Sequence, residues 1–219
     1  MPVNATTYHS IIQELKQSNT TLVAVSKTKP VADILELYNL NQRDFGENYV
    51  QELIEKEAQL PKDIRWHFIG HLQSNKVKYI AAFVHLIHGV DSLNLLKEIN
   101  KQAAKNSRII NCLLQIHIAQ EETKFGFNES ELLQLNQLEQ FKNVNICGLM
   151  GMASFTDDMQ KVKSEFAYLK SLQNKFIIQH PSFNILSMGM SSDYKIAIKE
   201  GSTMVRIGSL LFGDRTYNK

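Results

Sequence analysis

The chain has 219 residues, enough to bury one sizeable core and close to the roughly 200 residues of a small (β/α)8 barrel. Its 43% hydrophobic and 21% charged residues exclude a disordered or fibrous protein. The 24 Lys and Arg residues against 22 Asp and Glu give a net charge of +2 without a long run of one sign. We therefore expect no nucleic-acid partner, and only small anionic ligands.

The first 17 residues lack the charged segment and apolar run of a secretion signal. No stretch of the chain approaches the ~18 apolar residues of a membrane span. Cys112 and Cys147 each lie in a predicted strand, which is typical of buried reduced thiols and not of a disulfide framework or a metal pair. We expect a single domain over residues 1–219, a cytoplasmic location and no membrane partner.

Short apolar runs alternate with amphipathic stretches, as parallel strands covered by helices do. We predict eight strands, at residues 21–26, 44–46, 66–69, 86–90, 111–118, 144–150, 185–187 and 204–207. We predict helices at residues 8–18, 31–40, 50–59, 75–82, 92–105, 129–140, 158–179 and 194–200, with Ser92 and Asn128 as N-caps. This alternation predicts an α/β fold, a single (β/α)8 TIM barrel, with an open doubly wound sheet as the alternative.

The functional residues of a TIM barrel lie at the carboxyl ends of its strands. The first predicted strand leads into the motif SKTKP, where Pro30 ends the strand and Lys27 lies at its carboxyl end. Side chains alternate along a strand, so Val23, Val25 and Lys27 share one face. If that face points into the barrel, desolvation and neighbouring cations favour a neutral, nucleophilic amine suited to Schiff-base formation with an aldehyde. An ordinary solvated lysine is the alternative interpretation.

Two later segments predict an anion site. Ser191 and Ser192 follow the seventh strand, where their hydroxyls and backbone N–H groups can face a bound anion or simply cap the next helix. Gly208 and Ser209 follow the eighth strand, where a glycine lets the backbone approach a phosphate closely. Arg206 occupies a strand position that should face the barrel mouth, and a buried charge needs a partner, which favours a functional role.

Two polar motifs follow the second and third strands. The first contains Asn48; in the second, His67 lies between two aromatic residues and fits a core position. His71 lies in the loop beyond, where a ligand can reach it, and we favour it over His67 as a functional residue. No spacing of His, Cys and Asp resembles a zinc or calcium site, so we expect no metal.

Together these motifs resemble the pyridoxal-phosphate homeostasis protein family. The resemblance rests on AVSKTKP at 24–30, FGENYVQE at 45–52, WHFIGHLQSNK at 66–76, GLMGMA at 148–153, SMGMSSDY at 187–194 and GSTMVRIG at 201–208. It implies a barrel similar to the N-terminal domain of alanine racemases, with pyridoxal 5'-phosphate (PLP) held as a Schiff base on Lys27. It also implies that Arg206 lies toward the pyridine nitrogen and that the phosphate is held by the segments containing Ser191, Ser192, Gly208 and Ser209. We add Asn48 and His71 to the expected cofactor-binding residues.

The same resemblance bears on catalysis. Racemases of this fold add a C-terminal β-domain that supplies a second acid/base residue, and we expect this chain to end before such a domain. A permanent cation at the ring nitrogen disfavours its protonation and weakens the ring as an electron sink. We therefore expect no catalytic residues, and a monomer that manages PLP, supplies it to apo-enzymes and helps to balance amino-acid pools. A weak racemase or decarboxylase and a phosphosugar enzyme on the same barrel are the alternatives.

Overall fold

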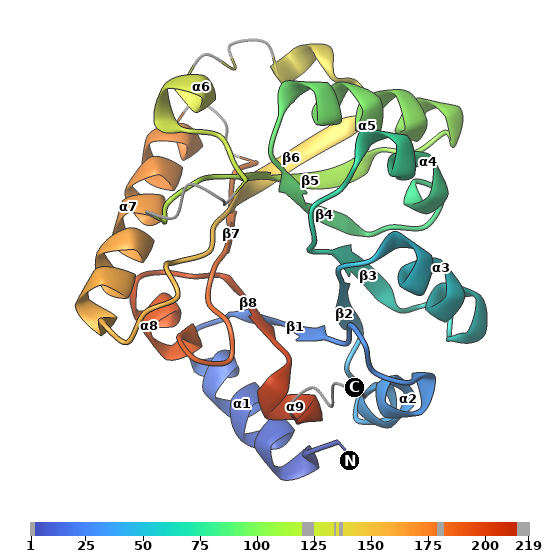
Figure 1. The fold of residues 1–219 in the computed structure, drawn as a ribbon, viewed down its shortest axis with the longest axis vertical. Helices are drawn as coiled ribbons and strands as arrows, with labels where there is room; N and C mark the ends of the chain where they lie inside the picture. The colour runs from blue at the N-terminus through green and yellow to red at the C-terminus, as the bar shows by residue number, and fades with distance from the viewer. Residues whose placement is uncertain (1–2, 120–124, 134, 136–137, 179–181, 214–219) are drawn as a thin grey trace.

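Eight parallel strands of the computed structural model close into a barrel in chain order, and helices cover its outer face (Figure 1). The structure describes residues 3–119, 125–133, 135, 138–178 and 182–213. The strands are β1 (Thr21–Val25), β2 (Asp44–Glu47), β3 (Arg65–Phe68), β4 (Leu86–Val90), β5 (Ile110–Gln115), β6 (Val144–Met150), β7 (Ile185–Ser187) and β8 (Met204–Ile207). The closed barrel is the predicted fold, and the doubly wound alternative is wrong.

The barrel closes where the last strand pairs with the first, so that the blue and red ends of the chain lie together in Figure 1. Val23 of β1 is paired in register with Arg206 of β8. Strand alternation then turns Val23 and Arg206 inward from neighbouring strands. The register therefore brings the side chains that follow β1 and β8 to the same mouth.

The predicted strands agree with the observed ones to within one residue at each end, apart from the fifth. We expected that strand to reach residue 118, but β5 ends at Gln115 because the chain then turns, and Ile116 makes only an isolated bridge to Phe127. The apolar residues beyond the strand are still buried. Hydrophobicity here marks burial in a loop and not continued strand pairing.

The helices on the outside of the barrel are α1 (Ala5–Gln17), α2 (Val31–Asn39), α3 (Val50–Gln59), α4 (Val77–Ile80), α5 (Leu93–Lys105), α6 (Glu129–Leu133), α7 (Met159–Ile177), α8 (Tyr194–Lys199) and α9 (Ser209–Phe212). Two 3-10 turns, η1 (Ser74–Lys76) and η2 (Leu138–Gln140), complete the described elements. Among these residues no helix combines the length and the apolar character that crossing a membrane requires.

Several helix boundaries differ from the prediction. The first helix begins earlier than residue 8 because Asn4 caps it, its side chain accepting a hydrogen bond from the backbone N–H of Thr7. The helix expected at 75–82 is a 3-10 turn followed by one α-helical turn, and the one expected at 129–140 divides into α6 and η2, with residues 134, 136 and 137 outside the described part. The four-residue helix α9 was not predicted, because one turn is too short to show a hydrophobic period.

Both predicted N-caps are confirmed. Ser92 accepts from the N–H of Leu95 at 3.3 Å. Asn128 accepts from the N–H of Glu131, whose carboxylate accepts from the N–H of Asn128, each at 2.9 Å. This reciprocal pair is a capping box, and it fixes where α6 begins.

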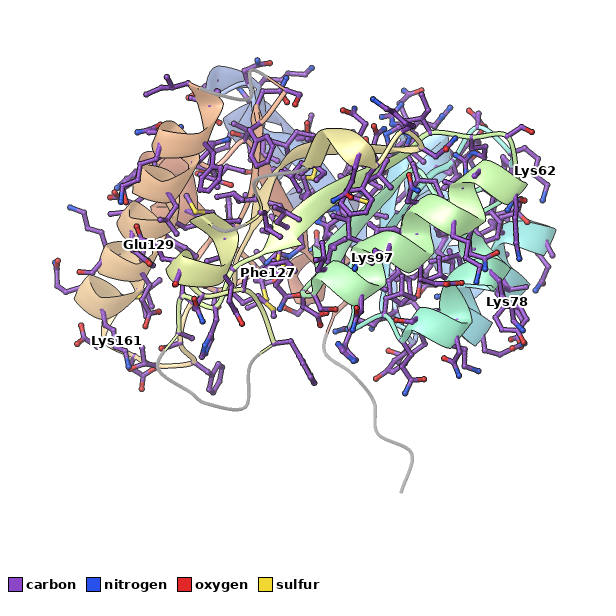
Figure 2. All side chains as sticks on the ribbon, turned by 90° about the horizontal axis from the view of Figure 1, so that it is seen from above. Lys62, Lys78, Lys97, Phe127, Glu129 and Lys161 are labelled. Carbon is purple, nitrogen blue, oxygen red and sulfur yellow. The ribbon has the colours of Figure 1, made fainter. Side chains whose placement is uncertain are left out.

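The apolar core has two layers. One lies inside the barrel and is built from Val23, Leu86, Leu113, Cys147, Met150 and Met204. The larger layer lies between the strands and the helices. Charged side chains such as Lys78 of α4, Lys97 of α5 and Lys62 of the loop after α3 lie on the outer surface (Figure 2). Cys112 and Cys147 are both free and buried, as predicted.

Candidate functional site

A cavity of about 730 Å³ opens at the carboxyl ends of the strands. Its walls come from the loops after six strands, and it is lined by Val25, Lys27, Lys29, Asn48, Ile69, Met152, Phe155, Met190, Ser191, Ser192, Arg206, Gly208, Ser209, Leu210 and Gly213. All of the predicted cofactor-binding residues except His71 are among them. Loops that are far apart in the sequence therefore meet where the barrel fold places functional groups.

The backbone on both sides of Lys27 is fixed by a partly buried ion cluster. Lys56 Nζ donates to the carbonyl oxygen of Ser26 at 2.7 Å, and the Ser26 hydroxyl donates to Glu47 Oε1 at 2.6 Å. On the other side, the N–H of Thr28 donates to Glu52 Oε1 at 2.6 Å. Lys27 itself is half-buried and lines the cavity.

Lys56 joins the parts of this cluster. Its ammonium lies 2.8 Å from Glu47 Oε1 and 2.6 Å from Glu52 Oε1, and the Lys56 side chain is buried. Burial raises the pKa of Glu47, an effect that the nearby Lys56 charge opposes. We call Lys56, Glu47 and Glu52 the Lys56 clamp. Sequence analysis missed it; the one available signal was the i, i+4 spacing of Glu52 and Lys56 on a predicted helix.

Arg206 lies inside the barrel mouth, as strand alternation predicted. It is only 4% exposed; its Nη1 donates to Ser187 Oγ at 2.6 Å and its Nη2 to the carbonyl oxygen of Gly151 at 3.1 Å. Burial lowers the pKa of Arg206 to about 10, with the charge of Asp193 acting in the opposite sense. The guanidinium therefore stays a cation at neutral pH and can only donate hydrogen bonds.

The loops after β7 and β8 form one polar wall of the cavity. The N–H of Gly208 donates to Ser191 Oγ at 3.2 Å, which ties the two loops together. A Cβ atom at Gly208 would lie 3.2 Å from the carbonyl oxygen of Val25, so this position suits a residue without a side chain. Ser192 and Ser209 line the same cavity, so four polar positions from two loops face one space.

Asn48 and His71 have different surroundings. Asn48 lines the cavity, and its buried Oδ1 has no hydrogen-bond partner among the described residues. His71 does not line the cavity; its Nδ1 lies 2.9 Å from Asp91 Oδ2, and its ring stacks on Phe125 at 4.0 Å. The structure thus places His71 outside the cavity, and a role of His71 in cofactor binding stays a prediction. His67 is buried and hydrogen-bonded, as expected of a core histidine.

Lys29 also lines the cavity, where it holds the carboxyl end of α9. Its Nζ donates to the carbonyl oxygens of Phe212 and Gly213, at 2.8 and 3.1 Å. Helix α9 begins at Ser209, which belongs to the polar wall. Loss of the Lys29 hydrogen bonds at the carboxyl end of α9 should therefore make the polar wall less rigid.

We therefore expect Lys29→Ala to speed the release of a bound phosphate ligand by about 5-fold, the effect of losing roughly 1 kcal/mol of hydrogen bonding. The variant should still attach PLP to Lys27. Stopped-flow absorption during transfer to a PLP-requiring apo-enzyme measures the release. A release rate equal to that of the unaltered protein would show that Lys29 does not support the wall.

A parallel barrel with a lysine after its first strand and a polar wall after its last two strands defines a barrel of the alanine racemase type. The family described as "Alanine racemase, N-terminal domain" accordingly matches residues 6–216. Within that class, the chain belongs to the pyridoxal phosphate homeostasis protein family. It is 42% identical over 202 residues to the family member from Aquifex aeolicus, covering 90% of this chain and 87% of that protein. It is also 42% identical to the Synechocystis member over 213 residues, covering 95% of this chain and 97% of that one.

Solved structures agree with this assignment. PipY of Synechococcus elongatus, determined without PLP, superposes with a TM-score of 0.90 at 37% identity and covers 95% of this chain and 99% of its own. The form of PipY with PLP bound gives a TM-score of 0.88. Alanine racemase of Clostridium difficile is 14% identical, with a TM-score of 0.76; this chain covers 59% of it, and the likeness is one of fold alone.

Proposed function

We propose that this protein binds PLP in the cavity at the barrel mouth, through Lys27, and manages the cofactor without substantial catalysis. The observation that carries the proposal is that the mouth combines Lys27, the guanidinium of Arg206 and the polar wall after β7 and β8. Membership of the homeostasis family and the PLP-bound form of PipY support it. We further propose that a single domain acts as a cytoplasmic monomer and passes PLP to apo-enzymes.

The residues present fit PLP chemically. The amine of Lys27 matches the aldehyde of PLP, and the hydroxyl and backbone N–H donors of the polar wall match its phosphate. The guanidinium of Arg206, which only donates hydrogen bonds, matches the nitrogen of its aromatic ring. The buried Asn48 Oδ1 adds a polar atom without a partner among the described residues, as expected beside a polar ligand. The cavity volume of about 730 Å³ suits a molecule of this size.

Each residue then has a distinct task. PLP supplies an aldehyde that an amine can capture and a ring that withdraws electrons. Lys27 would hold the aldehyde carbon, Ser191, Ser192 and Ser209 would donate to the phosphate, and Gly208 would let the backbone approach it. Arg206 would donate to the ring nitrogen and keep it unprotonated, since a guanidinium cation neither gives up its proton readily nor accepts one.

The ionisable groups at the mouth favour a binding role over catalysis. Among the described residues that line the cavity, these groups are Lys27, Lys29 and Arg206. The Lys29 ammonium is engaged with backbone carbonyls, and a buried guanidinium is a poor base. Racemisation needs acid/base groups on opposite faces of the amino-acid α-carbon, and these residues supply no second base.

The test is to load the protein with PLP, reduce it with borohydride and map the modified peptide by mass spectrometry. We expect a coloured protein, one adduct on the Lys27 peptide, and no amino-acid turnover above that of free PLP. An adduct only on Lys29 or Lys76 would reject the assignment of Lys27. A colourless protein would favour a phosphosugar enzyme, and amino-acid turnover near a typical enzyme value of about 10 per second would reject the non-catalytic role.

Arg206→Ala should weaken PLP binding by about 1.5 to 3 kcal/mol, the usual loss for a hydrogen bond made by a charged group. The Lys27 adduct should still form, because Arg206 does not supply the amine. Titration followed by absorption and borohydride trapping measures both quantities. Arg206→Lys is the matched variant: it keeps the charge without the planar fork, and we expect intermediate binding. Unchanged affinity and spectrum in Arg206→Ala would place Arg206 away from the ring.

A further inference from the structure

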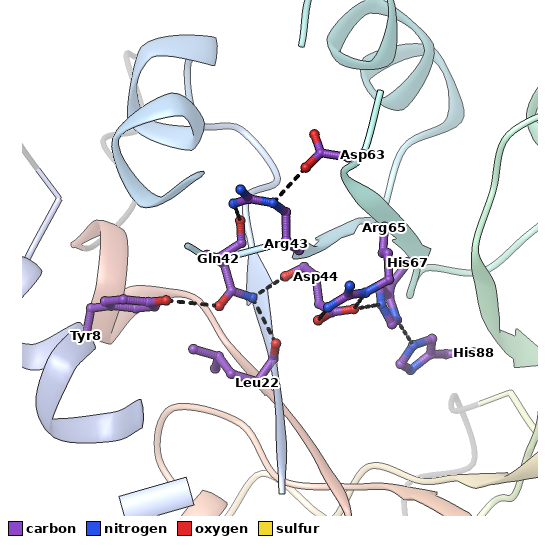
Figure 3. A network of polar contacts seen from close by, with 9 residues as sticks. All are labelled: Tyr8, Leu22, Gln42, Arg43, Asp44, Asp63, Arg65, His67 and His88. Carbon is purple, nitrogen blue, oxygen red and sulfur yellow. Dashed lines mark hydrogen bonds and ion pairs between the residues drawn. The ribbon is translucent and has the colours of Figure 1, made fainter. Parts of the chain in front are cut away.

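A continuous row of hydrogen bonds runs through the barrel from Arg206. Arg206 Nη1 lies 2.6 Å from Ser187 Oγ, which lies 3.0 Å from His88 Nδ1. His88 Nε2 lies 2.9 Å from His67 Nδ1, and His67 Nε2 lies 2.9 Å from Asp44 Oδ1 (Figure 3). These five residues are buried and come from β2, β3, β4, β7 and β8.

The far end of the row reaches a second cavity, of about 230 Å³, at the opposite mouth of the barrel. Asp44, Arg65, His67 and His85 are among its lining residues. Arg65 donates to both carboxylate oxygens of Asp44, at 2.7 and 2.5 Å. Gln42 donates to the backbone carbonyl of Asp44 at 2.6 Å and fixes that end of β2 (Figure 3). The row thus joins the two ends of the barrel.

The end groups of the row, a donor-only guanidinium and an acceptor-only carboxylate, favour one direction for its bonds. Ser187 Oγ accepts from Arg206 and has one proton, which we assign to the bond with His88 Nδ1. Burial lowers the pKa of His88 well below its ordinary value, so its ring is neutral and carries its proton on Nε2. That proton points to His67 Nδ1, which leaves the proton of His67 on Nε2, facing Asp44.

Asp44 completes the row as an acceptor. Burial alone would raise the pKa of Asp44, but hydrogen bonds from Arg65 and His67 outweigh burial and hold the pKa below its usual range. With both rings neutral, reversing the row would turn an imidazole lone pair toward this carboxylate. The arrangement in which each donor points from Arg206 toward Asp44 instead gives every one of these groups a partner.

We propose that this row is the positioning device for Arg206: Ser187, His88, His67 and Asp44 orient the guanidinium toward the cofactor ring. The inference rests on the proposed function, because it assigns the row a role toward bound PLP. The partners of Arg206 that are within hydrogen-bond distance, Ser187 and Gly151, are neutral. The row continues from Ser187 to Asp44, which Arg65 holds through both carboxylate oxygens, so the hydroxyl that accepts from Arg206 is itself anchored at the opposite mouth.

The first test needs no cofactor. Two-dimensional NMR of the ¹⁵N-labelled, cofactor-free protein distinguishes the histidine tautomers by the shifts of the ring nitrogens. We expect the rings of His67 and His88 both to carry a proton on Nε2 and to leave Nδ1 as an acceptor, as the assigned direction of the row requires. A proton on Nδ1 of His88, or a doubly protonated His67 or His88, would overturn the assigned direction. This result stands whether or not the protein binds PLP.

The second test breaks the row at its centre. Phenylalanine at position 88 removes both hydrogen bonds, so His88→Phe should weaken PLP binding about 10-fold and shift the visible band of the loaded protein. Glutamine can accept from Ser187 and donate to His67, so His88→Gln should stay within about 2-fold of the unaltered protein. His85→Gln is the control, because His85 packs on His67 at 5.5 Å without entering the row. A normal His88→Phe, or an equal loss in His85→Gln, would overturn the proposal.

A third variant covers the case in which His88→Phe does not fold. Asp44→Asn keeps an oxygen that can accept from His67 but replaces the second acceptor of Arg65 with a donor. The anchored end of the row should then loosen, and PLP binding should weaken about 3-fold with a shifted band. Affinity and spectrum equal to those of the unaltered protein would overturn the role of Asp44 in the row. Failure of the unaltered protein to bind PLP would reject the proposed function instead.

Discussion

Lys27→Ala is expected to abolish the borohydride-stable attachment of PLP and to weaken binding at least about 100-fold. The reason is that covalent capture of an aldehyde needs a primary amine, and the cavity is lined by the amines of Lys27 and Lys29 in the described part of the chain. Lys29 is a poor substitute, because its Nζ is held by the carbonyl oxygens of Phe212 and Gly213. Absorption titration and mass spectrometry after reduction measure the loss.

Two controls separate chemistry from folding. Lys29→Ala removes the other amine of the cavity and should keep the adduct, and thermal unfolding of both variants should reveal any loss of structure. The backbone around Lys27 is fixed through Ser26 and Thr28, so the fold should persist in Lys27→Ala. An undiminished adduct in this variant, or its loss in Lys29→Ala alone, would move the attachment away from Lys27.

The positions of Lys27 and Arg206 could be predicted because both depend on local rules. Alternation along β8 places Arg206 at the barrel mouth, and the carboxyl end of a parallel strand places Lys27 there. The expectation that Pro30 ends the first strand is wrong: β1 ends at Val25, Lys27 lies in the turn that follows, and Pro30 is the N-cap of α2. Short apolar runs likewise gave strand boundaries close to the observed ones. Sequence reasoning succeeds here because the period of a strand is independent of the rest of the fold.

The Lys56 clamp and the interior row could not be predicted, because they depend on tertiary contacts. Lys56 lies on an amphipathic helix and resembles an exposed lysine until the fold brings Ser26, 30 positions away, to its ammonium. His88 and Ser187 are 99 positions apart and meet only when the barrel closes. The direction of the His71 side chain depends on a loop without a repeating pattern. The residues that support the site are thus less visible in the sequence than those that line it.

The Lys56 clamp leads to the last prediction, that Lys56→Met lowers the free energy of unfolding by about 3 kcal/mol at neutral pH. Methionine keeps much of the side-chain volume, but its substitution leaves the carboxylate of Glu47 buried without its ammonium partner, which costs about 3 to 5 kcal/mol in comparable cases. The backbone carbonyl of Ser26 also loses its donor, so attachment of PLP to Lys27 should slow. Urea unfolding measures the first effect and the rate of colour formation the second.

The pH dependence of that loss distinguishes a buried charge from a packing defect. Burial already raises the pKa of Glu47, and removing the Lys56 charge should raise it further. A carboxyl whose folded-state pKa is raised contributes stability below its unfolded pKa, near 4.3, and this contribution is lost as the pH rises through the folded value. Lys56→Met should therefore lose less stability at pH 5 than at pH 8.

Lys62→Met, at an exposed ion pair with Glu57, should change stability by under about 1 kcal/mol at either pH. An equal loss at both pH values in Lys56→Met would show that packing, and not the charge of Glu47, makes the clamp necessary.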